Sequence, residues 1–224
     1  VFLDRINRDN PTPAQGEIES TNPCGEQPLL PYEACNLGSI NLACFFVPGH
    51  EHDEDPAAAG IDWDGLKQVV HLAVRFLDNV IDASRFPLER IDETVRRNRK
   101  IGLGVMGFAD VLNRLGIPYD SDQGVALAEE LMGFIETRGH QASQALAVER
   151  GPFPLFHQSI YKDQAPLRNA TVTTIAPTGT ISMIAGGASG IEPIFAYAYI
   201  RNVMDNTQMV EVNPVLVEVL KERG

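Results

Sequence analysis

The sequence contains little cysteine, a single tryptophan and no long apolar run. Its three cysteines among 224 residues are too few, and too odd in number, for the disulfide framework of a secreted domain. We therefore expect reduced thiols and a cytoplasmic protein. No uncharged apolar run approaches the ~18 residues of a membrane-spanning helix, and the first residues lack the order of a signal peptide. The chain begins at Val1 without a methionine, and we expect it to open inside a strand of a longer protein.

Positive charge is also scarce. Lysine and arginine number 18 against 30 aspartates and glutamates, which gives a formal net charge of −12. Such a chain lacks the basic surface that binds nucleic acid or a membrane surface, so neither partner is expected. One small anionic ligand stays compatible, because backbone N–H groups can hold it locally. The one basic run, at positions 96, 97, 99 and 100, is interpreted as the polar last turn of a helix.

No recognisable metal site is present in the sequence. There is no Cys-x-x-Cys pair and the five histidines are scattered, so zinc spacing is missing. The run from His50 to Asp55 is rich in metal-ligating side chains, but prolines and glycines flank it on both sides. We interpret this run as a solvated acidic loop rather than a metal centre.

Periodicity and helix-breaking residues predict alternating helices and strands. Five prolines between residues 7 and 34 exclude a continuous helix there, and a long irregular stretch inside a domain is often functional. Apolar spacing of three and four residues predicts a helix from Asp62 that ends before Pro87. Further helices are expected at 88–99, 121–148, from about 180, and at 215–221, with strands at 37–46, 101–105, 170–176 and 195–201. This alternation predicts an α/β fold with some parallel pairing.

The first candidate site is the proline-braced stretch 22–28. In an extended segment alternate residues project to the same side, so Asn22, Cys24 and Glu26 can face one cavity with an amide, a thiol and a carboxylate. The alternative is a proline- and glycine-rich loop whose cysteine is a small buried hydrophobe. The residues alone leave both interpretations open.

The second candidate site is the turn Pro177-Thr178-Gly179-Thr180-Ile181-Ser182. It follows a neutral strand, and residues 169–200 contain a single charged side chain, Glu192. A glycine-containing turn that leads into a helix presents free N–H groups to an anion. The turn has no Walker lysine, and the alternative is an ordinary helix cap made by Thr178 or Thr180.

Three stretches resemble one family, in the same order along the chain. Residues 22–31 and 33–42 resemble the catalytic finger loop of ribonucleotide reductase large subunits. Their sequence is most similar to that of the class II, adenosylcobalamin-dependent enzymes. Residues 98–108, and 176–182 with 190–193, resemble two further motifs of that family. The resemblance implies that residues 1–224 are a partial catalytic domain of a ten-stranded α/β barrel. Its central finger loop would span about 20–36, and its phosphate-binding turn about 176–183.

The resemblance also implies roles for individual residues. Cys24 would be the thiyl-radical residue that abstracts the 3′ hydrogen of the ribose, and Glu26 the base that takes the 3′-hydroxyl proton. Asn22 would hold the sugar hydroxyls, and Cys35 would be one of two cysteines that supply reducing equivalents. The residues that would bind the substrate phosphates are Pro177, Thr178, Gly179, Thr180, Ile181 and Ser182. Cys44 matches no such role and is expected to be packed.

The implied activity is reduction of ribonucleotides to 2′-deoxyribonucleotides, with adenosylcobalamin as cofactor and a thiol reductant such as thioredoxin as partner. We expect the fragment to be inactive alone, because the partner of Cys35 would lie upstream. The sequence does not decide whether the longer protein forms a homodimer, nor does it distinguish diphosphate from triphosphate substrates. Two alternatives remain: a fragment of a class I large subunit, and a non-enzymatic α/β module that binds nucleotide or phosphate.

Overall fold

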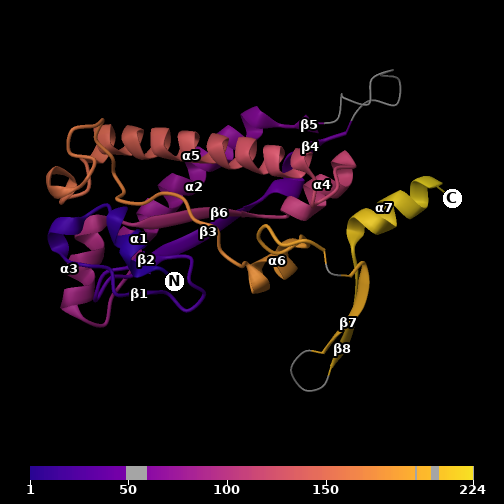
Figure 1. Ribbon diagram of the computed structural model, residues 1–224, viewed down its shortest axis with the longest axis horizontal. Coiled ribbons are helices and arrows are strands. Elements are labelled where there is room, and N and C mark those ends of the chain that lie inside the picture. Colours follow the sequence, from indigo (N-terminus) through magenta and orange to yellow (C-terminus); the bar gives the residue numbers. More distant parts are fainter. Residues whose placement is uncertain (49–59, 195, 203–206, 224) are drawn as a thin grey trace.

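The computed structural model describes residues 1–48, 60–194, 196–202 and 207–223 (Figure 1). Its centre is a parallel pair of strands, β3 (Asn36–Asn41) and β6 (Ile101–Met106), in register along their whole length. Residues 171–174 run along the other edge of β6, through backbone hydrogen bonds and a parallel bridge between Leu103 and Thr173. This arrangement confirms the predicted α/β class with parallel pairing. The described strands form four two-stranded sheets and no closed barrel.

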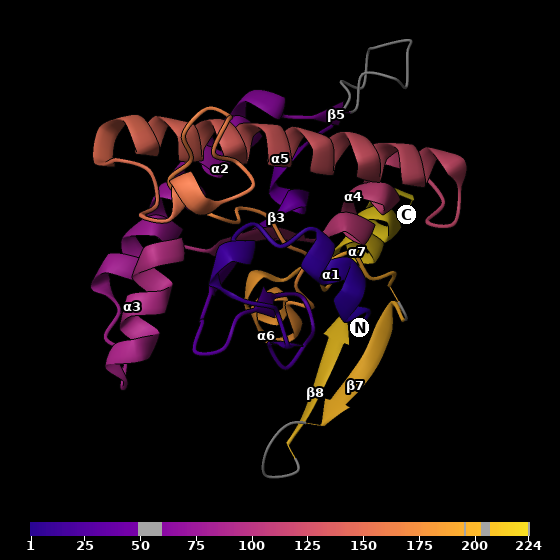
Figure 2. The same ribbon diagram turned by 60° about the vertical axis from the view of Figure 1, so that its left-hand side comes forward.

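Two long helices, α2 (Trp63–Ala83) and α5 (Asp122–Arg150), cover one face of this strand pair (Figures 1 and 2). Both begin at capping residues: the Asp62 carboxylate accepts the Gly65 N–H at 2.9 Å, and Ser121 caps α5 in the same way. The apolar side of α2 packs against β3, β6 and α5. The most deeply buried members of this core include Leu66, Val70, Val74, Ile81, Ile101, Leu103, Leu131 and Ile135.

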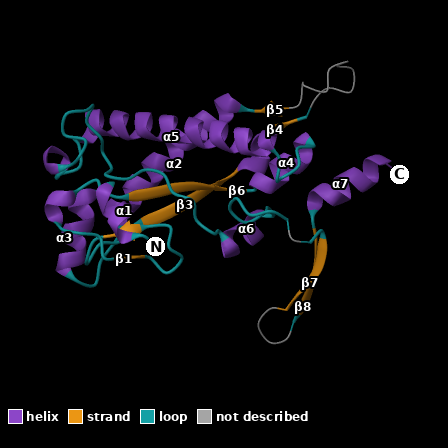
Figure 3. Cartoon of the chain, in the orientation of Figure 1, coloured by secondary structure: helices purple, strands orange, loops and turns teal. Residues whose placement is uncertain are grey.

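The opposite face of the strand pair carries the short strands β1 (Ser20–Thr21) and β2 (Pro28–Leu29) and the helix α6 (Gly179–Ala185) (Figures 1 and 2). Figure 3 shows an antiparallel hairpin and the last helix projecting away from the centre. These are β7 (Ala198–Asn202), β8 (Gln208–Val212) and α7 (Pro214–Arg223). The other elements are α1 (Leu3–Arg8), β4 (Phe46–Val47), β5 (Gly60–Ile61), α3 (Glu89–Asn98), α4 (Phe108–Leu115) and 3-10 turns at Pro13–Gln15, Leu42–Phe45 and Phe156–Gln158.

Several elements differ from the sequence-based expectation. The chain opens with a helix, α1, instead of a strand. The strand expected at 37–46 ends at Asn41, because the Asn41 side chain accepts the Ala43 N–H at 3.1 Å and starts a 3-10 turn. The strand expected at 170–176 is reduced to the bridge at Thr173. Cys44, expected to be packed, is exposed.

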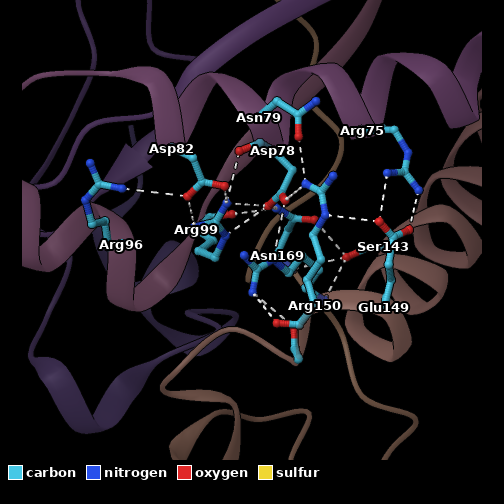
Figure 4. A network of polar contacts seen from close by, with 12 residues as sticks. Arg75, Asp78, Asn79, Asp82, Arg96, Arg99, Ser143, Glu149, Arg150 and Asn169 are labelled. Carbon is cyan, nitrogen blue, oxygen red and sulfur yellow. Dashed lines mark hydrogen bonds and ion pairs between the residues drawn. The ribbon is translucent and has the colours of Figure 1, made fainter.

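The basic run at 96–100 is the largest departure from expectation, because Arg99 and Lys100 are buried and not part of a solvated helix end. The guanidinium of Arg99 contacts Asp78 at 2.9 Å, and the same carboxylate accepts Arg150 at 3.2 Å and Arg168 at 3.3 Å. Three guanidinium groups thus share one carboxylate that is fully buried (Figure 4). This network joins α2, the end of α3, α5 and the segment that precedes residue 171.

Within the described ranges, no helix combines the length and the apolar character needed to cross a membrane. The same ranges hold no group of three or more histidine, cysteine or acidic side chains that could bind a metal ion. The run from His50 to Asp55 lies outside the described residues.

Candidate functional site

Residues 20–29 form a tight hairpin-like loop in which β1 and β2 pair antiparallel. Asn22 closes its tip twice: its backbone N–H donates to the Gln27 carbonyl, and its side-chain oxygen accepts the Gln27 N–H, both at 3.0 Å. Gly25 has a φ of +88°, a conformation that glycine adopts readily and other residues rarely do. The tip is therefore a compact turn, which differs from the extended segment expected around Cys24.

Cys24 and Glu26 line one cavity together with the segment that leads into α6. The cavity has a volume of about 320 Å³, and its other lining residues are Gly25, Ile175, Ala176, Pro177, Gly190, Ile191 and Glu192. Cys24 is exposed, whereas Oε2 of Glu26 is buried without a hydrogen-bond partner among the described residues. Leaving a buried acceptor unpaired is unfavourable, so this oxygen is suited to accept a hydrogen bond from a ligand hydroxyl.

The turn at 176–183 uses its buried hydroxyls internally. Thr178 has a left-handed φ of +57°, and its hydroxyl accepts the Gly190 N–H at 2.7 Å. The hydroxyls of Ser182 and Ser189 are hydrogen-bonded at 2.9 Å. Thr178 and Ser182 therefore fix the start of α6 against residues 189–190. The exposed residues of the first turn of α6 are Gly179, Thr180 and Ile181.

Of the predicted site residues, the structure brings together Cys24, Glu26 and Pro177. Asn22 is not among the cavity-lining residues, and its side-chain oxygen serves to close the loop tip. Cys35 lies immediately before β3, at the base of the loop, and does not line the cavity either. The side chains that could carry chemistry in this cavity are therefore one thiol and one carboxylate from the loop, with a second carboxylate from Glu192.

A buried ion pair neighbours Cys35. Nζ of Lys100 donates to Oε2 of Glu33 at 2.6 Å, and the two side chains are 1% and 0% exposed. The Glu33 carboxylate also accepts the Leu30 N–H at 2.9 Å and the Asn98 amide at 2.6 Å. A buried charge needs such partners, so this set of contacts holds residues 30–33 on the start of β6.

Burial raises the pKa of the Cys35 thiol to about 12. The positive charge of Lys100 opposes this shift, because it favours the thiolate, while the carboxylates of Glu33 and Glu26 add to it. The thiol donates to the Asn36 carbonyl at 3.4 Å. At neutral pH the Cys35 sulfur is therefore protonated and a poor nucleophile.

We expect iodoacetamide at pH 8 to alkylate Cys24 and Cys44 and to spare Cys35. Cys24 and Cys44 are exposed to the reagent, whereas burial raises the pKa of Cys35 far above pH 8 and leaves almost no thiolate there. Timed labelling followed by peptide mass spectrometry measures the three rates. The Cys35 rate should rise roughly tenfold per pH unit between pH 8 and 10. Equal labelling of all three cysteines at pH 8 would contradict the buried, protonated state.

Sequence reasoning gave no role to Glu192, although this residue lines the cavity. A signal was present, since Glu192 is the one charged side chain in residues 169–200. Burying an unpaired charge is unfavourable, so a single charged side chain in a neutral segment indicates contact with solvent or a polar ligand. Its neighbours Gly190 and Ile191 also line the cavity, and all three belong to the stretch 190–193 that resembles a motif of the family.

Comparison with known proteins decides the family. The family model described as "Ribonucleotide reductase, barrel domain" matches residues 1–166 and 163–224, which together include every residue. The chain belongs to this family. Membership confirms the resemblance from which the finger loop and the phosphate turn were named.

The relatives of the chain differ in their sequence identity to it. The chain is 55% identical over its whole length to the vitamin B12-dependent ribonucleoside-diphosphate reductase of Thermoplasma acidophilum, of which it covers 28%. It is 54% identical to the protein of the same name from Mycobacterium tuberculosis, of which it covers 31%. The ribonucleoside-diphosphate reductase subunit alpha of Chlamydia pneumoniae is 31% identical over 98% of the chain and 24% of that protein. The chain thus spans less than a third of these relatives.

Proposed function

We propose that the chain forms part of the catalytic barrel of an adenosylcobalamin-dependent ribonucleoside-diphosphate reductase. The observation that carries this proposal is the cavity in which the exposed Cys24 and the unpaired oxygen of Glu26 face the segment ending in Pro177. The relatives at 54–55% identity carry vitamin B12 in their names, and the subunit alpha at 31% does not. This difference favours class II over a class I fragment, and the family match disfavours a non-enzymatic module.

In this proposal the loop tip carries the radical and the base. Cys24, as a thiyl radical, takes the 3′ hydrogen of the ribose, and Oε2 of Glu26 accepts the 3′-hydroxyl proton, for which hydrogen-bond reach is sufficient. The Asn22 oxygen already accepts a backbone N–H, so its NH₂ group is the part that would donate to a sugar hydroxyl. The diphosphate would lie at the exposed N–H groups at the start of α6, in the turn that Thr178 and Ser182 hold in place.

Cys35 is proposed as one of the two thiols that reduce the sugar. The 2′ C–O bond breaks and water leaves, a C–H bond forms at the same carbon, and two thiols become a disulfide. The second thiol would lie elsewhere in the longer protein, and a thiol reductant such as thioredoxin would restore the pair. The protonated state of Cys35 at neutral pH fits a residue that gives hydrogen and not one that attacks as a thiolate.

The surroundings of Cys24 fit a large cofactor that approaches from outside the loop. Cys24 is exposed, and the cavity of about 320 Å³ lies at the small end of the range for drug-sized ligands, which suits a sugar ring better than a corrinoid. Adenosylcobalamin, when bound, would supply the radical that oxidises the Cys24 thiol.

We further propose that the parallel strands β3 and β6 form part of a ten-stranded barrel in the longer protein. We also propose that this protein is cytoplasmic and forms a homodimer.

A Cys35→Ser variant of the full-length reductase tests this assignment. With adenosylcobalamin and a nucleotide labelled with tritium at the 3′ position, the wild type should release tritium and form deoxynucleotide. The variant should still release tritium, since Cys24 is intact, and should release free base in place of deoxynucleotide over repeated turnovers. Chromatography of the products measures both outcomes. Normal deoxynucleotide yield from the variant with a dithiol protein as reductant would place the redox pair elsewhere.

A further inference from the structure

We propose that Thr174 is a positioning residue that fixes the tip of the finger loop, and with it Cys24 and Glu26, against the segment leading to the phosphate turn. This inference rests on the proposed function and deepens it, because it assigns the placement of the catalytic pair to a side chain outside the loop. Thr174 itself is not among the residues that line the cavity.

The first contact joins the loop to the neighbouring segment. The Thr174 hydroxyl donates to the backbone carbonyl of Glu26 at 2.9 Å, across 148 positions in sequence. The backbone N–H of Thr174 donates to the Leu103 carbonyl at 3.0 Å, so the residue that holds the tip is itself fixed to β6. Thr174 thereby connects the backbone of Glu26, whose side chain is the proposed base, to β6.

The second contact packs the tip against β6. Gln27, next to Glu26, is 4% exposed and packs over the bare Cα of Gly102. A Cβ at Gly102 would lie 2.5 Å from Nε2 of Gln27 and 2.9 Å from Cγ2 of Thr174. The amide of Gln27, a methyl of Leu37 and the methyl of Thr174 thus fill the space above Gly102 together. The Thr174 methyl packs there, while its hydroxyl bonds to the loop.

The hydrogen bonds within the loop cannot replace this anchor. Asn22, Gly25 and Gln27 bond to one another and preserve the shape of the turn, but these bonds do not join the turn to β6. Without the Thr174 hydroxyl, the packing of Gln27 on Gly102 still limits the tip, but no hydrogen bond fixes the Glu26 backbone relative to Pro177. A displacement of about 1 Å at a reacting group can lower a rate on the order of 100-fold.

The test compares three variants of the full-length reductase. Thr174→Val keeps the shape and removes the hydroxyl, while Thr174→Ser keeps the hydroxyl. Thr171→Val is the matched control, because the Thr171 hydroxyl on the same segment donates to the Ile101 carbonyl of β6 at 3.0 Å and not to a loop carbonyl. We expect Thr174→Val to lower kcat by roughly 10- to 100-fold with KM changed less than about 3-fold. Thr174→Ser should recover most of kcat, and Thr171→Val should keep it.

A second measurement does not depend on activity. Hydrogen exchange of a peptide covering residues 20–30 should become faster in Thr174→Val and stay unchanged in Thr171→Val. Equal effects of the two valine variants on kcat and on exchange, or no rescue by serine, would reduce Thr174 to an ordinary structural contact and overturn the inference. If the wild type forms no deoxynucleotide, the proposed function fails, whereas the exchange measurement still decides whether Thr174 anchors the loop.

Discussion

A Cys24→Ser variant of the full-length reductase is expected to form no deoxynucleotide while it binds the nucleotide as the wild type does. The serine hydroxyl is nearly isosteric with the thiol and, like Cys24, exposed at the edge of the cavity, so binding contacts are preserved. Its O–H bond is much stronger than an S–H bond, so the side chain cannot become the radical that takes the 3′ hydrogen. Product formation with adenosylcobalamin, and nucleotide affinity by calorimetry, measure the two effects separately.

Cys44→Ser provides the matched control for this experiment. Cys44 is also an exposed cysteine, but it lies outside the cavity that holds Cys24. Its replacement should leave turnover unchanged. Substantial deoxynucleotide formation by the Cys24 variant, or equal losses in both variants, would refute the radical assignment.

Replacing Asp78 by alanine should lower the free energy of unfolding strongly. Its carboxylate is 0% exposed and pairs with Arg99, Arg150 and Arg168, whose side chains are 5%, 27% and 13% exposed. Removing one partner of a buried ion pair leaves an uncompensated charge and typically costs about 3–5 kcal/mol. Urea unfolding of the chain, followed by the fluorescence of Trp63, its one tryptophan, should show a correspondingly lower midpoint.

Glu149→Gln is the control for the Asp78 experiment. Glu149 pairs with Arg75 on the neighbouring turns of the same two helices, but both side chains are about half exposed. Solvent screens such a pair, so its loss should change the urea midpoint far less than the loss of Asp78 does. Equal shifts in the two variants would mean that the buried network contributes no more than a surface pair.

Local patterns were sufficient for the long helices but not for the buried charges. The spacing of apolar residues and the Asp62 cap predict α2 closely, because both act within a few residues of each other. Arg99 and Lys100 look like a solvated helix end, since their carboxylate partners Asp78 and Glu33 lie 21 and 67 positions away. Whether a charge is buried depends on such distant partners, and no local pattern reveals them.

The candidate site likewise combines local features with contacts between distant residues. The residue types in the loop and in the turn indicated a thiol, a carboxylate and an anion-binding backbone before any fold was known. The hydrogen bond from Thr174 to the Glu26 carbonyl joins residues 148 positions apart, and the bond from Gly190 to the Thr178 hydroxyl joins residues 12 positions apart, so no local pattern reveals either. Helix α4 was missed although Gly107 and Gly116, both at positive φ, mark its two ends.

The finger loop is held at two points, by the Glu33–Lys100 ion pair at its base and by Thr174 at its tip. Because of these contacts, the loop loses its conformational entropy during folding and not during ligand binding. Ordering one residue costs roughly 1–2 kcal/mol of conformational free energy. In a mobile loop this cost would fall on ligand binding and weaken it. Here these contacts order the loop when the protein folds, so the proposed nucleotide substrate would bind without the cost of ordering it.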